Sequence, residues 1–274
     1  MSGRHALLGL LALLPACGAL VVPMAEGARY APCLDHTFEV SGGLQLFSEF
    51  DTKLRVDSEV LGLGTTIDLE DDLGFNKTSN VARFDMGLAL SESSRLDFSI
   101  FNLTRGAEHR LERDIQIGDK LFQINWDVHS AIRTTVYKLA YRWVFWRDRR
   151  FDLGLSGGLH WIGLAAKVGS DSFAVYDRAA YELPLPVVGL HARYALLDDL
   201  RLSLSSEAFY VEIQGITGYL TDTRLDLDWD IGDNLGLGLG LNGFRTSVDA
   251  GDQWLHGKFT YEYGGLLLYL RVFF

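Results

Sequence analysis

Apolar and polar residues alternate along most of the chain with a period of two. In residues 38–50 the even positions are mostly apolar, beginning with Phe38 and Val40, whereas the odd positions are mostly polar, beginning with Glu39 and Ser41. Successive side chains of a β-strand point to opposite faces, so this period predicts strands with one apolar and one polar face. The alternation recurs in residues 83–90, 96–100, 137–145, 151–156, 190–194, 201–205, 224–231, 235–242 and 259–274.

The connections between these segments alternate between short and long. The four short ones carry the Asp, Asn, Gly and Ser residues that turns favour; they are Ser91–Ser94, Arg147–Arg150, Leu197–Asp199 and Gly232–Asn234. The five longer ones are residues 57–80, 105–122, 169–181, 212–220 and 249–256. Short turns at one end and long loops at the other are typical of a bacterial outer-membrane barrel with an even number of strands and both termini in the periplasm.

These patterns predict an all-β protein, a transmembrane antiparallel up-and-down β-barrel of about ten strands, with eight or twelve as alternatives. Residues 105–125 could instead form a hairpin that extends the barrel above the membrane. After residue 25 no apolar run approaches the 18 residues or so that a membrane-spanning helix needs.

A soluble β-sandwich or lipocalin-like barrel would also show alternation, but two features argue against it. The acidic residues Asp226, Asp228 and Asp230 form an unbroken row opposite Leu and Trp. Large aromatic residues lie beside the short turns or the C-terminus, where an interfacial girdle belongs; the girdle residues are Trp143, Trp146, Trp229, Phe273 and Phe274.

The N-terminal 25 residues have the pattern of a secretory signal peptide. Arg4 precedes an apolar run over residues 6–22 that ends in small residues, and cleavage is expected after Ala25. A membrane anchor and lipidation of Cys17 are the alternatives. Residues 26–36 then form a short periplasmic segment and residues 37–274 the barrel, in which Cys33 of the mature chain has no cysteine partner.

The C-terminal residues 264–274 resemble the assembly signal that the insertion machinery reads in bacterial outer-membrane barrels. Hydrophobic residues occupy every second position up to Phe274, although Tyr269 stands where the family often has Gly. Residues 64–75 and 234–244 also resemble stretches of small, uncharacterised Gram-negative outer-membrane barrels. The resemblance implies location in the outer membrane, contact with its lipid and lipopolysaccharide, and the insertion machinery as a partner during assembly; it implies no activity.

Charge argues against nucleic acid as a partner. The net charge is −11, and removal of the signal peptide leaves 24 basic against 36 acidic residues. A phosphate-binding surface requires an excess of Lys and Arg.

The polar face of the strands defines a charged lumen. Its predicted lining residues carry both signs, and they are Arg83, Asp85, Asp97, Lys138, Arg142, Asp152, Arg201, Glu207, Arg224, Asp226, Asp228, Asp230 and Arg271. Ten strands lie between filled eight-stranded barrels and open porins, which favours a plugged or very narrow lumen filled by ion pairs over a selective channel. The inward glycines Gly236, Gly238 and Gly240 either leave space for water or make room for bulky partners.

The last strand shows an apparent change of phase. Phe259, Tyr261 and Tyr263 are odd, whereas the apolar residues from Leu266 onward are even, which predicts a β-bulge at Gly264–Gly265 and places Glu262 inside.

Two further groups are weaker candidates for chemistry. The first long loop carries Asp68, Glu70, Asp71 and Asp72, which could bind a divalent cation, but a solvated acidic loop is the stronger interpretation. No cofactor motif is present.

Asp127 and His129 share one face of a strand, where a carboxylate could orient an imidazole, but Ser130 points the other way. The motifs of the omptin proteases and lipid A deacylases are absent, so the prediction is no enzyme. A narrow channel or a structural barrel with a plugged lumen is the leading functional hypothesis. A surface-binding protein that acts through its extracellular loops is the alternative, and an outer-membrane hydrolase the third.

Overall fold

The computed structural model describes residues 36–56, 65–117, 120–170, 175–213, 216–252 and 255–274. The predicted signal peptide, Cys17, Cys33 and most of the short periplasmic segment lie outside these residues. No helix in the described part of the chain is long and apolar enough to cross a membrane.

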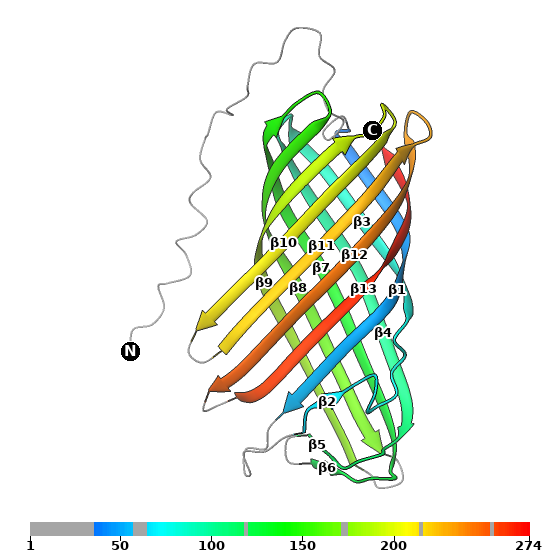
Figure 1. The fold of residues 1–274 in the computed structure, drawn as a ribbon, viewed down its shortest axis with the longest axis vertical. Helices are drawn as coiled ribbons and strands as arrows, with labels where there is room; N and C mark the ends of the chain where they lie inside the picture. Colours follow the sequence, from blue (N-terminus) through cyan, green and yellow to red (C-terminus); the bar gives the residue numbers. More distant parts are fainter. Residues whose placement is uncertain (1–35, 57–64, 118–119, 171–174, 214–215, 253–254) are drawn as a thin grey trace.

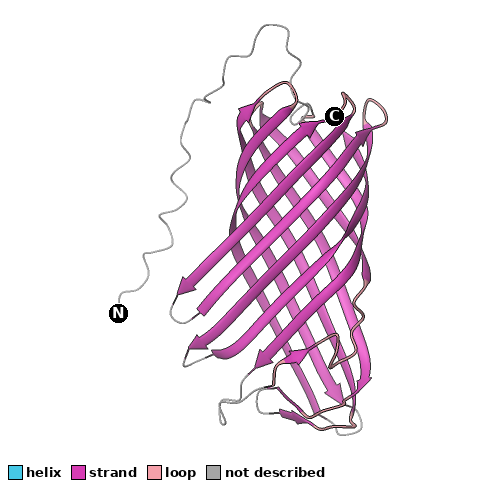
Figure 2. Cartoon of the chain, viewed as in Figure 1, coloured by secondary structure: helices cyan, strands magenta, loops and turns pink. Residues whose placement is uncertain are grey.

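Ten long antiparallel strands form a closed barrel (Figures 1 and 2). They are β1 (Phe38–Val56), β3 (Ser79–Ser91), β4 (Ser94–Arg110), β7 (Asp127–Arg147), β8 (Phe151–Ser170), β9 (Val175–Ala195), β10 (Leu200–Ile213), β11 (Ile216–Asp230), β12 (Leu235–Asp252) and β13 (Leu255–Phe273). Each strand pairs with its neighbour along the chain, and β13 pairs back onto β1. Closure satisfies the backbone groups that a sheet edge would expose to lipid, and the predicted fold and strand number are confirmed.

The two ends of the barrel differ, as expected. The four predicted short turns lie with the C-terminus at the upper end of Figure 1, which is the periplasmic end in barrels of this type. At the other end the residues between β1 and β3 include β2 (Ile67–Asp68), and a small hairpin of β5 (Ile115–Ile117) and β6 (Lys120–Phe122) lies between β4 and β7. This hairpin, with the long β4 and β7, confirms the extension considered for residues 105–125.

Three of the five predicted long loops are wrong. Strand pairing runs through most of residues 169–181, 212–220 and 249–256. β8 continues to Ser170 and β9 starts at Val175; β10 and β11 pair up to Ile213 and Ile216, and β12 and β13 pair up to Asp252 and Leu255. Above the bilayer the outward face no longer has to be apolar, so the alternation fades although the hydrogen-bonded ladder continues. Sequence periodicity therefore underestimates strand length.

The outer surface carries a band of exposed apolar side chains, and the charged residues lie inside. Leu241 on β12, Leu268 and Leu270 on β13, and Leu139 on β7 are each at least half exposed. A water-soluble barrel would have the opposite arrangement, with apolar residues inside, so the soluble alternative is excluded and the barrel is a transmembrane one.

The phase change in the last strand is not where the sequence places it. Odd residues of β13 face inward from Phe259 to Phe273. The register shift is instead on β1, where Phe47 pairs with Gly265 and Glu49 with Gly264, so that Ser48 is the extra residue. Since β1 changes face there, Phe50 points inward with Phe47, contrary to the sequence prediction. Glu262 lies outside, where it pairs with Arg245 (3.3 Å).

The prediction that Phe273 belongs to the interfacial girdle is wrong. Phe273 is only 2% exposed and stacks on His36 (3.8 Å between ring centroids). Its odd position in β13 turns it inward. Phe274 is 66% exposed, Trp146 54% and Trp229 49%, as a girdle requires, and Trp143 is half-buried.

The interior is built in three layers. A charged layer fills the periplasmic half, and an aromatic layer crosses the lumen beyond it. The aromatic layer consists of Phe47, Phe50, Phe101, Phe244, Tyr261 and Tyr263, packed against Val81, Leu103, Val136, Ile162, Val187 and Leu220. Nearest the extracellular end is a loop core of Ile67, Leu69, Leu73, Phe75, Leu111, Ile115, Phe122, Val128 and Ile132.

Candidate functional site: the lumen

All thirteen lining residues expected from the sequence face the interior. Seven are buried, namely Arg83, Lys138, Asp152, Arg201, Asp226, Asp228 and Arg271. The other six, Asp85, Asp97, Arg142, Glu207, Arg224 and Asp230, are half-buried. They follow one another along strands whose outward neighbours contact lipid, so the same alternation that builds the apolar band builds this layer.

At the periplasmic end the layer is an ion-pair ladder. Arg201 donates two hydrogen bonds to Asp230 (2.7 and 2.8 Å), and Arg271 donates to the same carboxylate. Arg271 also approaches Glu39 (3.6 Å), and Arg95 then joins Glu39 to Asp97. Buried charges of this kind are tolerated only when paired, so the ladder closes the periplasmic mouth with mutually compensating groups.

Two members of the ladder, Glu39 and Arg95, were not predicted. Both occupy inward, odd positions of strands that the alternation had identified, so the pattern that found Asp85 and Asp97 could have found them. What the sequence does not show is that they meet, since β1 and β4 are separated by β3 in the sheet.

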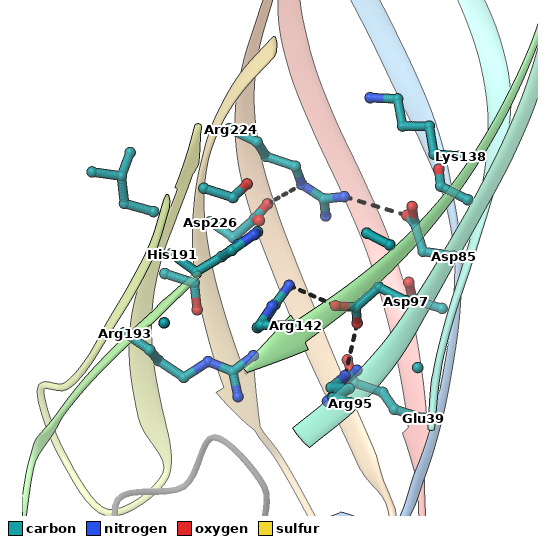
Figure 3. Close-up of a pocket in the computed structure, with 18 of the residues that line it drawn as sticks. Glu39, Asp85, Arg95, Asp97, Lys138, Arg142, His191, Arg193, Arg224 and Asp226 are labelled. Atoms are coloured by element: carbon teal, nitrogen blue, oxygen red, sulfur yellow. Dashed lines mark hydrogen bonds and ion pairs between the residues drawn. The ribbon is translucent and has the colours of Figure 1, made fainter. Parts of the chain in front are cut away.

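On the extracellular side of the ladder lies a cavity of about 180 Å³, shown in Figure 3. Arg142 binds Asp97 (2.9 Å) at its lower side, and Arg224 bridges its upper side between Asp226 (2.7 Å) and Asp85 (3.4 Å). Arg224 is on β11 and Asp85 on β3, so this pair spans the lumen. The cavity has room for a small group of water molecules but is crossed by side chains.

The inward glycines make room for bulky partners, which decides between the two interpretations left open by the sequence. A side chain at Gly238 would collide with the ring of Tyr269, and one at Gly240 would collide with Asp226. Tyr269 donates a hydrogen bond to Asp228 (2.6 Å) and has Arg224 above its ring at 5.3 Å. The glycines therefore let a large aromatic side chain lie flat against the wall.

The boundary of the charged layer nearest the aromatic layer holds a buried polar cluster. His160 contacts Glu207 through Nε2 (2.7 Å), and Lys138 donates to Asp222. The nearest ligand atoms of His160, Glu207 and Asp222 lie within 4.8 Å of one another, a spacing that a metal ion could use. Lys138 already supplies a cation to this cluster, so its side chains are compensated without a metal.

The acidic residues of the first loop are engaged in the structure of the loop itself. Asp68 accepts hydrogen bonds from the backbone N–H groups of Glu70 and Asp71, and Glu70 binds Arg105 (2.6 Å). Asp72 pairs with Arg113; partial burial would raise the pKa of Asp72, but hydrogen bonds from Arg113 and from the Asp68 N–H outweigh it and lower that pKa. These contacts fix the loop over the barrel.

The residues considered for catalysis lie on opposite faces of β7. His129 is exposed on the outer face, as is Asp127, and pairs with Glu108 (3.2 Å). Ser130 is buried and faces inward, as the sequence indicated, while His191 binds Ser156 (2.8 Å) in the lumen.

A closed barrel with a lipid-facing apolar band and a charged interior defines the class: a transmembrane β-barrel of the outer-membrane type. Comparison with solved structures agrees. The outer membrane protease OmpT from Escherichia coli matches with a TM-score of 0.52 and 11% identity, covering 90% of this chain and 99% of that one. This likeness shows the fold alone, which matches Gram-negative outer-membrane proteins.

Two other matches have lower TM-scores. Ail of Yersinia pestis matches with 10% identity and a TM-score of 0.39, covering 85% of this chain and 98% of that one. OprG of Pseudomonas aeruginosa matches with 8% identity and a TM-score of 0.39, covering 90% and 98%. Neither a protein-family model nor a curated protein sequence matched the chain.

Proposed function

We propose that the protein is a structural outer-membrane barrel whose lumen is closed to the axial passage of solutes. The aromatic layer carries this proposal. Its rings are each 2–3% exposed, and they touch one another across the lumen: Tyr263 lies 4.9 Å from both Phe47 and Phe244 and 6.3 Å from Phe101, between ring centroids.

Aliphatic side chains complete the aromatic layer around the rest of the wall. Val136, Ile162, Val187 and Leu220 come from β7, β8, β9 and β11, and each is at most 4% exposed. An ion that moved along the axis would have to leave the charged layer and enter a dry apolar one, at a cost of many kcal/mol. The narrow-channel hypothesis therefore requires these rings to move aside.

Planar-bilayer conductance tests this proposal. The wild-type barrel, purified from membranes, is expected to be silent, while a Phe47→Ala, Phe244→Ala, Tyr263→Ala variant is expected to give discrete current steps. A Leu239→Ala, Leu241→Ala, Leu268→Ala variant, altered only on the lipid face, is the matched control and should stay silent. Current steps from the wild type would overturn the proposal in favour of a channel.

A second candidate function is surface binding, and the loop core favours it. Residues from both long loops pack together, and Arg105 buries its guanidinium against Glu70, Thr52 (2.7 Å) and the ring of Phe50 (4.1 Å). A pre-organised surface loses less entropy on binding than a mobile loop. Replacement of residues 111–124 by a short Gly–Ser turn should then abolish binding to immobilised lipopolysaccharide while the barrel keeps its heat-dependent gel shift. Unchanged binding would exclude this surface.

A further inference from the structure

The barrel wall is incomplete between β9 and β10. β9 pairs with β8 along its whole length, from Tyr194 opposite Phe151 to Val175 opposite Ser170. Its pairing with β10 stops at Val188 opposite Ala208, although β10 continues to Ile213 in register with β11. A seam therefore opens between residues 183–187 and 209–211. In Figure 1, β10 and β11 end well short of β4, β7 and β8 at the lower end.

Two prolines explain where the pairing ends. Pro184 and Pro186 have no N–H group, and because they are two residues apart their missing donors face the same neighbouring strand. The pairing of β9 with β8 continues past both prolines, whereas its pairing with β10 stops at Val188, two residues before Pro186. In a continued register Pro186 would oppose Tyr210 and Pro184 would oppose Glu212. The prolines thus remove the hydrogen bonds that would close the wall.

The seam is lined by apolar side chains that are less buried than the members of the aromatic layer on which they pack; Leu164 on β8 and Phe259 on β13 are half-buried on the same layer away from the seam. Leu183, Leu185 and Phe209 point inward and pack on the aromatic layer, yet all three are only half-buried. Their inward neighbour Val187 and, on the closed side of the barrel, Phe244 are each 3% exposed.

A second short gap, between β3 and β4, has no such lining. Pairing there stops at Arg83 opposite Phe101, but the inward residues Val81 and Leu103 are 6% and 2% exposed. The partial exposure at the β9–β10 seam is therefore not a general consequence of an unpaired strand end.

The outer rim of the seam continues the lipid-facing surface. Val188 is 70% exposed and Leu190 49%, and both belong to the apolar band; Tyr210 on the opposite rim is 65% exposed. Beyond Val188 the outward positions are Pro186, Pro184 and then Glu182, so the seam begins where the band ends. Unpaired strand edges do not occur within the hydrocarbon core, which places the seam at the outer interface of the membrane.

These observations point to one occupant. A partner β-strand is disfavoured, because the edge of β9 lacks the donors that strand addition uses. Apolar side chains instead lie on both faces of the seam, with Val188 and Leu190 on the lipid-facing side and Leu185 and Phe209 against the aromatic layer. We propose that the seam between residues 183–187 of β9 and 209–211 of β10 admits an alkyl chain of an outer-leaflet lipid to the edge of the aromatic layer.

Photolabelling tests the inference directly. The protein, purified from membranes, is placed in vesicles whose phospholipid carries a diazirine in its acyl chain, irradiated, and mapped by mass spectrometry. Adducts are expected on the outward residues Val188 and Leu190 and also on the inward residues Leu185 and Phe209, but not on the inward Phe244. Labelling confined to outward residues would overturn the proposal.

A matched pair of variants separates the seam from the open extracellular end. Pro184→Thr with Pro186→Thr restores two donors, and two additional ladder bonds should lower inward relative to outward labelling by about tenfold. Leu239→Thr, on the fully paired β12, should leave the ratio unchanged. Inward labelling that is equally strong in both variants would show entry through the end of the barrel and reject the seam. Axial closure is tested by conductance and the seam by labelling, so either can fail without the other.

Discussion

Single residues in this barrel are chosen by what lies beside them on the neighbouring strand. Gly238 and Tyr269 are paired neighbours on β12 and β13, and the tyrosine ring occupies the space of the missing side chain. Glycine is unfavourable in a strand for entropic reasons, so its repeated use here reflects packing.

Gly238→Ala is expected to destabilise the barrel by about 1–3 kcal/mol, because Tyr269 must leave the wall and its hydrogen bond to Asp228 is strained. The measurement is the midpoint of urea unfolding, followed by the gel shift of the folded form. Gly243→Ala is the control, since nothing lies within 4 Å of the added carbon. Equal midpoints would show that the ring adjusts without cost.

At the scale of the element, one extra residue in β1 decides which side chains enter the lumen. The bulge at Ser48 lets Phe47 and Phe50 both face inward, where their rings lie 5.0 Å apart. It lies opposite Gly264 and Gly265, whose lack of side chains allows the close approach of β1: a Cβ at Gly265 would collide with the backbone of Leu46.

Deletion of Ser48 should leave a barrel that still folds. Without the extra residue Phe47 and Phe50 lie two positions apart, so strict alternation keeps Phe50 and Thr52 inward and the pairing of β1 with β13 continues in register. Ser48→Ala keeps the bulge and loses only an exposed hydrogen bond to Gly264 (3.3 Å), so it should fold. The readout is the fraction of heat-modifiable protein in outer membranes, and a deletion variant that fails to fold would show that the bulge itself is required.

At the scale of the whole molecule, the barrel combines a sealed axis with a charged periplasmic half. Eight acidic and six basic side chains line the cavity, histidine aside, which leaves an excess of negative charge. A charged lining sets the selectivity of a pore once a pathway exists.

The opened Phe47→Ala, Phe244→Ala, Tyr263→Ala variant should therefore prefer cations, measured as the reversal potential in a KCl gradient. Adding Asp85→Asn and Asp226→Asn should reduce this preference, whereas Glu262→Gln, on the outer face, should not. An anion preference in the opened variant would mean that the pathway avoids the cavity.

The amino-acid sequence by itself determined the class of fold, the ten strands and the thirteen lumen residues. Lipid on one side and a polar interior on the other impose a period of two on every strand, and this period can be recognised within each short segment of the sequence. The period assigned Phe50, Tyr261 and Phe273 to the lipid-facing side, which is wrong, because apolar residues that fill the lumen resemble those that meet lipid.

Tertiary structure alone decided the bulge, the pairs across the lumen, the aromatic seal and the seam. Each depends on which residues of distant strands lie opposite one another: Arg224 finds Asp85 across 139 positions of sequence, and the β9 prolines matter only because of the strand beside them. Alternation fixes the face of a residue but not its partner, since register is set by the closure of the whole barrel.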